Sequence, residues 1–135
     1  MSIVLFAGIL SAMTTAEVAN KYVALCRAGK YMEALETLYA ADVVSVEAME
    51  FGGMQREIHG KEAVRGKNKS WFETNEVRSA LVTGPFSSPE RFAVMFSFDW
   101  TVKATGERQH LSEVAVYTVV DGKIVREEFL YAEAL

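Results

Sequence analysis

One acidic side chain near the C-terminus stands on a strand face that is otherwise apolar. The dipeptide Asp121-Gly122 separates two apolar runs. It predicts a hairpin with a two-residue loop, because both central positions of that turn need a positive φ. Val120 then pairs with Lys123, and cross-strand neighbours share a face. The face of Glu127 also carries Ser112, Val114, Val116, Thr118, Val125, Phe129 and Tyr131.

An unpaired carboxylate is costly to bury among apolar side chains. Glu127 is therefore a candidate for acid–base chemistry, and an ion pair with a nearby Arg or Lys is the structural alternative. The opposite face of the hairpin is predicted to meet solvent or a second subunit, because its charged residues could pair with one another. That face carries Glu113, Tyr117, Arg126 and Glu128.

An aromatic strand precedes this hairpin. Phe96, Phe98 and Trp100 alternate with smaller or polar residues, which is typical of a half-buried strand with one aromatic face. Together with Trp71, Phe129 and Tyr131, they are the predicted apolar surface of a binding pocket.

The loop after the aromatic strand decides which residues lie beside this surface. A two-residue loop at Thr105-Gly106 would place Trp100 on the charged face of the following strand. A three-residue loop over 104–106 places the aromatic residues beside Ser112 and Val114 instead. The longer loop is favoured because it gathers the apolar side chains on one concave surface, but a bulge would reverse this result.

The elements that position these residues follow from capping and periodicity. Thr14 and Glu17 form a capping box, and the helix that begins there ends at Gly29. Two more helices are predicted over residues 30–39 and 61–75. Strands are predicted over 42–47, 77–84, 92–102, 109–120 and 123–131. Three helices followed by a sheet predict an α+β domain.

Composition excludes several classes of partner. A chain of 135 residues with a net charge of −4 fits one domain and argues against nucleic-acid or anionic-membrane binding, since both need a broad basic surface. The single cysteine, Cys26, rules out a disulfide framework and predicts a cytoplasmic location. Two histidines without metal-ligand spacing predict no metal site. Residues 1–12 are apolar but too short to span a bilayer, so we interpret them as an N-terminal extension before a single domain over 13–135.

The order of four short motifs resembles the SnoaL-like, ketosteroid isomerase-like branch of the nuclear transport factor 2-like superfamily. The motifs are YVAL and AG within residues 22–29, LYAAD at 38–42, GKEAV at 60–64 and DGKIV at 121–125. The resemblance implies a cone-shaped, curved mixed sheet wrapped around a pocket, with three helices in the N-terminal half. Because this superfamily holds isomerases, cyclases, hydrolases and non-catalytic modules, the fold alone does not settle the function.

The resemblance also assigns roles to single residues. Tyr22 matches the position of the tyrosine that binds an enolate oxygen, and Glu47 matches the position of the proton-transferring base. A slip of one residue would put Ala48 at the base position. The position of the second acid falls near Leu111 or Ser112, neither of which can serve as an acid, so Glu127 on the neighbouring strand is the alternative.

The predicted function is the binding of a small hydrophobic, oxygenated molecule, with acid–base chemistry of the isomerase, cyclase or hydrolase type. Tyr22, Glu47 and Glu127 are the candidate catalytic residues. No cofactor is implied, because a carboxylate base and a hydroxyl donor suffice for enolisation. The alternative is a non-catalytic ligand-binding or dimeric interaction module. A homodimer is expected through an apolar outer sheet face made of Leu111, Ala115, Val119, Ile124 and Leu130.

Overall fold

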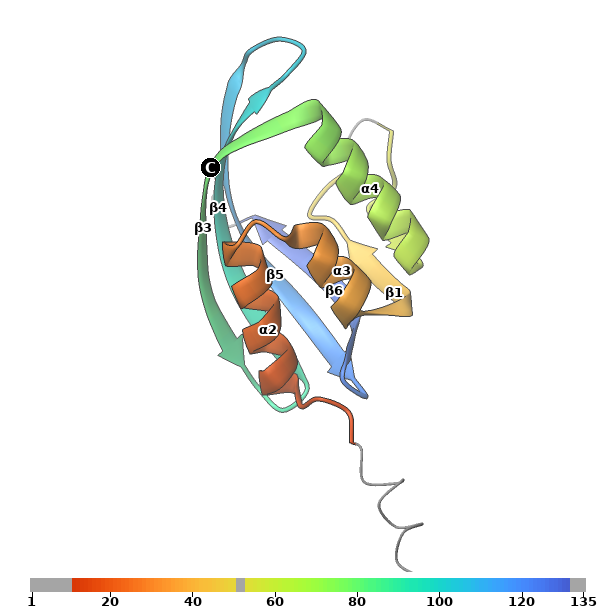
Figure 1. The fold of residues 1–135 in the computed structure, drawn as a ribbon. Coiled ribbons are helices and arrows are strands. Elements are labelled where there is room, and N and C mark those ends of the chain that lie inside the picture. Colours follow the sequence, from red (N-terminus) through yellow and green to blue (C-terminus); the bar gives the residue numbers. More distant parts are fainter. Residues whose placement is uncertain (1–10, 51–52, 132–135) are drawn as a thin grey trace, which may run out of the picture.

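A computed structural model describes residues 11–50 and 53–131, which form three helices and one six-stranded sheet (Figure 1). The helices are α2 (Thr15–Arg27), α3 (Tyr31–Leu38) and α4 (Lys61–Thr74). The strands are β1 (Tyr39–Val46), β2 (Glu57–His59), β3 (Asn75–Ser87), β4 (Arg91–Val102), β5 (Arg108–Val120) and β6 (Lys123–Tyr131). The predicted extension over 1–12 lies outside the described residues, apart from its last two.

The sheet is mixed, curved and open, with strand order β2-β1-β6-β5-β4-β3. The β1–β6 pair is parallel and the other four pairs are antiparallel. All three helices lie on one side of the sheet, with α2 and α3 over its lower part and α4 across its upper part (Figure 1). This arrangement confirms the predicted α+β cone. No helix within the described ranges has the length and apolarity that crossing a membrane requires.

Helix α2 begins where the sequence predicts. The Thr14 hydroxyl accepts a hydrogen bond from the Glu17 backbone N–H at 3.1 Å, and the Glu17 carboxylate accepts one from the Thr14 N–H at 2.9 Å. This reciprocal pair satisfies two backbone donors that the first turn leaves free. Just after the helix, Gly29 takes a φ of 74°, the left-handed conformation that glycine adopts without a steric penalty.

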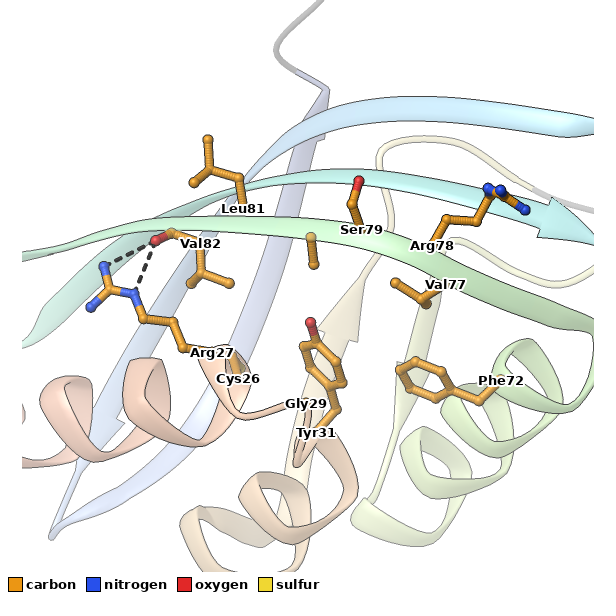
Figure 2. Close-up of a pocket in the computed structure, with 11 residues that line it drawn as sticks. Cys26, Arg27, Gly29, Tyr31, Phe72, Val77, Arg78, Ser79, Leu81 and Val82 are labelled. Atoms are coloured by element: carbon orange, nitrogen blue, oxygen red, sulfur yellow. Dashed lines mark hydrogen bonds between the residues drawn. The ribbon is translucent and has the colours of Figure 1, made fainter.

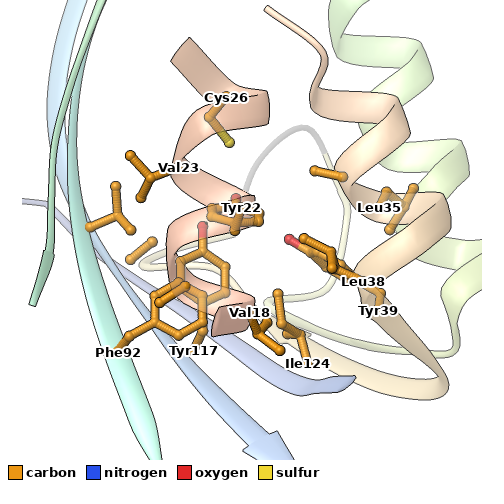
Figure 3. Close-up of a cluster of buried hydrophobic side chains, with 14 of the residues drawn as sticks. Val18, Tyr22, Val23, Cys26, Leu35, Leu38, Tyr39, Phe92, Tyr117 and Ile124 are labelled. Carbon is orange, nitrogen blue, oxygen red and sulfur yellow. Dashed lines mark hydrogen bonds between the residues drawn. The ribbon is translucent and has the colours of Figure 1, made fainter. Parts of the chain in front are cut away.

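The hydrophobic core lies between α2, α3 and the concave sheet face (Figure 3). Three aromatic rings pack together at its centre: Tyr22 of α2, Phe92 of β4 and Tyr117 of β5, with ring centroids 4.6 to 5.8 Å apart. Each of the three side chains is buried. The lower part of the cone is therefore filled by the protein's own side chains.

A β-bulge in the last hairpin overturns one predicted register. The turn at Asp121-Gly122 has the expected positive φ at both residues, 49° and 74°, and Val120 pairs with Lys123. Beyond Val119 and Ile124, however, the register shifts by one residue, so that Tyr117 lies opposite Glu127. Tyr117 and Glu113 therefore share the concave face with Glu127, and their predicted position on the outer face was wrong.

The loop between β4 and β5 is also longer than predicted. Thr101 pairs with Arg108, and the Val102 N–H donates to the Glu107 carbonyl at 2.8 Å, which leaves a four-residue loop over 103–106. The paired partners of the aromatic residues on β4 are consequently Glu113, Leu111 and Gln109. The three-residue loop was a wrong prediction, although the aromatic residues still face inward.

The predicted apolar outer face needs the same correction. Ala115, Val119 and Ile124 are buried in the core, and Leu111 lies opposite Phe98 on the concave side. Of the five residues expected on the outer face, Leu130 is exposed. The apolar residues that do lie on the outer face include Met95, Val114 and Leu130, which form one row across β4, β5 and β6 because each is paired with the next.

Candidate functional site

Glu127 points inward from β6, as predicted, and its side chain is 2% exposed. Tyr39 donates a hydrogen bond to its Oε1 at 2.5 Å, and Ser45 donates one to its Oε2 at 2.6 Å. The parallel β1–β6 ladder explains the second contact, since Ser45 and Glu127 are direct partners and therefore lie on one face. Two hydroxyl donors satisfy the buried carboxylate, which agrees with the rule that buried charges are hydrogen-bonded or paired.

Lys67 of α4 joins this carboxylate to a second one. Its Nζ donates to Glu47 Oε1 at 2.6 Å and to Ser45 Oγ at 2.9 Å, and it lies 3.8 Å from Glu127 Oε2. The ammonium is also 5.2 Å from the centre of the Phe129 ring, within the range of a cation–π contact. The Lys67 and Glu47 side chains are 12% and 19% exposed, so this ion pair lies between the interior and solvent.

A third carboxyl group, Glu113 of β5, completes what we call the acid cluster, defined as Glu47, Lys67, Glu113 and Glu127. Burial, together with the nearby charges of Glu47 and Glu127, raises the pKa of Glu113 to about 7, although Lys67 acts in the opposite direction. Among the described residues, no hydrogen bond or ion pair is made by its carboxyl group. It is therefore available to a ligand and changes its charge near neutral pH.

Tyr22 lies deeper in the molecule than a ligand-contacting tyrosine would. It is 7% exposed, and its hydroxyl shares a 2.5 Å hydrogen bond with the Tyr117 hydroxyl. Its ring centre is 6.3 Å from that of Tyr39, which holds Glu127. Burial raises the pKa of all three tyrosines well above the ordinary value of 10.0, so each keeps its proton.

Aromatic side chains adjoin the acid cluster on the concave face. Phe96, the partner of Glu113, stacks on Phe98 with ring centres 5.4 Å apart. Trp71 of α4 contacts Phe98 at 6.4 Å and Trp100 at 5.5 Å. Phe98, Trp71 and Trp100 are half-buried. An apolar wall thus lies next to groups that can donate, accept and exchange protons.

The predicted site residues therefore divide into those that the fold brings together and those that it separates. Glu47 and Glu127 meet through Lys67, and the aromatic residues Phe96, Phe98, Trp71 and Trp100 form one wall. Phe129 lies under Lys67, and Tyr131 is paired with Glu113. Ser112 and Val114 lie on the opposite, outer face, because their partners on β4 are Ser97 and Met95. Their predicted place in the pocket depended on the loop and hairpin registers corrected above.

Lys67 and Glu113 are the members of the cluster that sequence reasoning missed. Lys67 was hidden among the basic residues of a helix whose charges suggested a solvated surface. Glu113 was assigned to the outer face by the unbulged register. A useful signal was the presence of Tyr117 on the same face, because a strand face with a large aromatic residue is seldom left in solvent.

A groove of about 640 Å³ lies elsewhere, between β3 and the helices (Figure 2). Tyr31 and Phe72 point across it toward β3, and the Arg27 guanidinium donates to the carbonyls of Val82 at 3.0 Å and Gly84 at 3.2 Å. Since β3 is an edge strand, Arg27 covers carbonyl groups that would otherwise be free to pair. None of the described residues that line the groove carries a carboxylate, so the groove lacks the acid–base groups that the acid cluster has.

No set of three or more His, Cys, Asp or Glu residues suited to a metal was found among residues 11–50 and 53–131.

Comparisons with known proteins define the family. The model of the SnoaL-like domain matches residues 13–131, so the chain belongs to the SnoaL-like family of the nuclear transport factor 2-like superfamily. A search of curated proteins found no significant match.

Among solved structures, the chain is similar to a protein from Mesorhizobium loti. That protein is described as a proposed SnoaL-like polyketide cyclase, with carbohydrate phosphatase as a second description. The two share 45% identity over 88% of this chain and 100% of the other, with a TM-score of 0.83.

Two more distant structures support the fold alone. They are a proposed isomerase from Bacillus subtilis, at 23% identity and a TM-score of 0.68, and a proposed polyketide cyclase from Pseudomonas putida, at 22% identity and 0.65. The first comparison covers 87% of this chain and 85% of the other, and the second covers 89% and 92%.

Proposed function

We propose that the chain binds a small hydrophobic, oxygenated molecule on its concave face and moves a proton next to a carbonyl group, without a cofactor. The observation that carries this proposal is the position of Glu113. A carboxyl group with a pKa of about 7 lies beside the Glu47–Lys67 ion pair and opposite the aromatic Phe96. An acid that is half-protonated near neutral pH, next to an ionised carboxylate, is suited to paired proton transfer.

The proposed reaction divides the work between two carboxyl groups. Among the described residues, the Glu47 Oε2 atom has no hydrogen-bond partner, so it is the base that takes a proton from the carbon next to the carbonyl. The electron pair of that C–H bond forms a carbon–carbon double bond, and the carbonyl π electrons move to the oxygen. The Glu113 carboxyl group donates its hydrogen bond or its proton to this oxygen. In a substrate with a C=C bond next to the α-carbon, Glu47 returns its proton to the far carbon of that bond while the C=O bond re-forms and Glu113 recovers any proton it gave. These steps complete an isomerisation and restore both groups.

Glu127 and Tyr22, both predicted from the sequence to be catalytic, are proposed here as positioning residues. Glu127 is too buried to contact a ligand, but through Ser45 and its own charge it holds Lys67 in place. Lys67 in turn fixes the orientation of Glu47. Tyr22 positions Tyr117 through the hydrogen bond between their hydroxyl groups, and Tyr117 lies opposite Glu127.

The site does not favour phosphate-ester chemistry. Phosphoryl groups require several cationic donors or a bound metal ion to offset their charge. Lys67, the cation of the cluster, already contacts two carboxylates. The second description of the Mesorhizobium loti protein is therefore not carried over to this chain.

A non-catalytic binding module is the second candidate function, and one observation favours it. The rings of Tyr22, Phe92 and Tyr117 fill the lower part of the cone, and a cone filled by the protein's own aromatic side chains favours a module without chemistry.

We also propose a homodimer through the row of Met95, Val114 and Leu130 on the outer sheet face. Two of these residues are notably exposed, Leu130 at 52% and Met95 at 38%. The cytoplasmic location predicted from Cys26, which is buried and free, remains part of this proposal.

Hydrogen–deuterium exchange at the α-carbon of 1-tetralone, followed by NMR in D₂O, tests the proposal. The wild-type protein should accelerate exchange above the buffer rate, and Glu47→Gln should reduce this acceleration by about 100-fold, a usual loss for a general base. Glu128→Gln is the matched control, since Glu128 is on the same strand as Glu127 but on its exposed face. Exchange at the buffer rate with bound 1-tetralone would instead support the binding module.

A further inference from the structure

The charges of the acid cluster are unequal in number. Glu47 and Glu127 are two carboxylates in contact with one ammonium group, Lys67, at 2.6 and 3.8 Å. Glu113 adds a carboxyl group whose charge depends on pH. Arg56 donates to the Glu47 backbone carbonyl at 2.9 Å, but among the described residues no cation other than Lys67 forms an ion pair with a carboxylate of the cluster. Its net charge is therefore negative, whether or not Glu113 holds its proton.

The members of the cluster also differ in how many hydrogen bonds they can still form with a ligand. Two protons of the Lys67 ammonium are used by Glu47 and Ser45. Both Glu127 oxygens accept from hydroxyl groups. Besides the third Lys67 proton, whose nitrogen lies 3.8 Å from Glu127 Oε2, the second oxygen of Glu47 and the carboxyl group of Glu113 remain for a ligand. A protonated Glu113 can donate to a carbonyl oxygen, whereas a carboxylate or phosphate would bring a further negative charge next to Glu47.

Partial burial strengthens the effect of the cluster's negative charge on a ligand. The Lys67 and Glu47 side chains are mostly shielded from water, and charges at a few ångströms interact more strongly there than in bulk solvent. The aromatic wall of Phe98, Trp71 and Trp100 offers no charge to compensate an anion, but its ring faces are attractive to a cation. Burial and the aromatic wall thus disfavour an anionic ligand, as the net negative charge of the cluster does.

We propose that the acid cluster selects its ligand by charge: it binds an uncharged carbonyl compound, accepts a cationic analogue, and excludes carboxylates and phosphates. This inference rests on the proposed function, because it takes the concave face as the ligand site. It goes beyond that function by naming the charge class of the substrate.

The selection depends on pH through Glu113. The groups that face Glu113 are Glu47 at the end of β1, Lys67 of α4, Glu127 and Tyr131 of β6, and Tyr117 on its own strand. Below neutral pH, Glu113 donates to a ketone. Above neutral pH it is a carboxylate, so the ketone loses its donor and a cation gains a counter-charge.

Three probes with the same ring system test this: 1-tetralone, 1-aminotetralin and tetralin-1-carboxylate. Both tryptophans of the chain, Trp71 and Trp100, lie in the aromatic wall, so their indole N–H signals in NMR titrations report binding at this site. At pH 6 we expect the carboxylate to bind at least tenfold more weakly than the ketone. Between pH 6 and pH 8, the preference for the amine over the ketone should rise about tenfold, because a group with a pKa near 7 changes from mostly protonated to mostly ionised.

Glu113→Gln should remove the pH dependence of the preference for the amine over the ketone. The double variant with Glu47→Gln and Glu113→Gln should reduce the difference in affinity between the carboxylate and the ketone. The Glu128→Gln variant should behave as the wild type. Equal affinity for ketone and carboxylate in the wild-type protein would overturn the charge selection while leaving the binding site intact. A pH-dependent preference that survives in Glu113→Gln would overturn the role of Glu113. Absence of tryptophan shifts with all three probes would overturn the proposed function itself, and the charge selection with it.

Discussion

Replacing Glu113 by Gln should stabilise the protein, and by more at high pH than at low pH. The pKa of this carboxyl group is raised from an ordinary 4.5 to about 7 in the folded chain. Between these values, the unfolded chain loses its proton while the folded chain keeps it, so stability falls as the pH rises and the loss is complete above about pH 7. A shift of this size, from 4.5 to about 7, corresponds to at most about 3.4 kcal/mol at 1.36 kcal/mol for each pH unit. Since the side chain is half-buried, we expect about 2 kcal/mol.

Urea unfolding at pH 5 and pH 8.5 measures this effect. The unfolding free energy of the variant minus that of the wild type should be about 2 kcal/mol larger at pH 8.5 than at pH 5. For a domain of this size, that change corresponds to about 1 M in the urea midpoint. The matched control is Glu128→Gln, whose carboxylate is on the exposed face of β6 and should show no such change with pH. A Glu113→Gln difference that is the same at both pH values would refute the reasoning, because it would mean that Glu113 titrates as a solvated carboxyl group.

Three further predictions concern the surroundings of the cluster. Glu127→Ala should destabilise the chain by about 3 kcal/mol in urea unfolding, since it leaves buried hydroxyl donors without an acceptor; a loss below 0.5 kcal/mol would contradict the network. Tyr22→Phe should cost about 1–2 kcal/mol because it removes the hydrogen-bond partner of Tyr117, and a more stable variant would argue against that bond. Met95→Glu should turn a dimer into a monomer in sedimentation velocity, with Leu81→Glu at the edge strand as a comparison; a wild-type monomer at micromolar concentration would exclude the outer-face dimer.

The sequence was sufficient for the elements that local chemistry defines. The capping box at Thr14 and Glu17 and the Asp121-Gly122 turn involve contacts within a few residues, so the pattern alone determines them. The inward position of Glu127 was also predicted correctly, because it stands between apolar residues on its own strand. The strand β2 was missed, since three residues between glycine-rich segments carry no periodic signal.

The error in β5 has a physical cause. Both faces of this strand are apolar to a similar degree, since Val114 and Val116 alternate with Ala115 and Tyr117. Periodicity therefore could not decide which face is buried, and the prediction depended entirely on the hairpin register. A single unpaired residue, Val125, reversed that register. A bulge of this kind arises from packing across the whole sheet, so it leaves no trace in the sequence of the hairpin.

The site was predictable only in part for the same reason. Glu47 and Glu127 were both identified as candidates, but the sequence offered no way to see that one lysine connects them. Lys67 is 20 residues from Glu47 and 60 from Glu127 along the chain, and its contact with both depends on how α4 crosses the sheet. Contacts between distant elements are a property of the tertiary fold.

The most direct test of the central claim is a crystal structure of the protein with 1-tetralone bound. We expect the ring system against Phe98, Trp71 and Trp100, with the carbonyl oxygen within hydrogen-bond distance of the Glu113 carboxyl group and the α-carbon facing Glu47. If the ligand instead occupies the groove between Tyr31, Phe72 and β3, with the acid cluster unchanged, the acid cluster is not the ligand site and the account is contradicted.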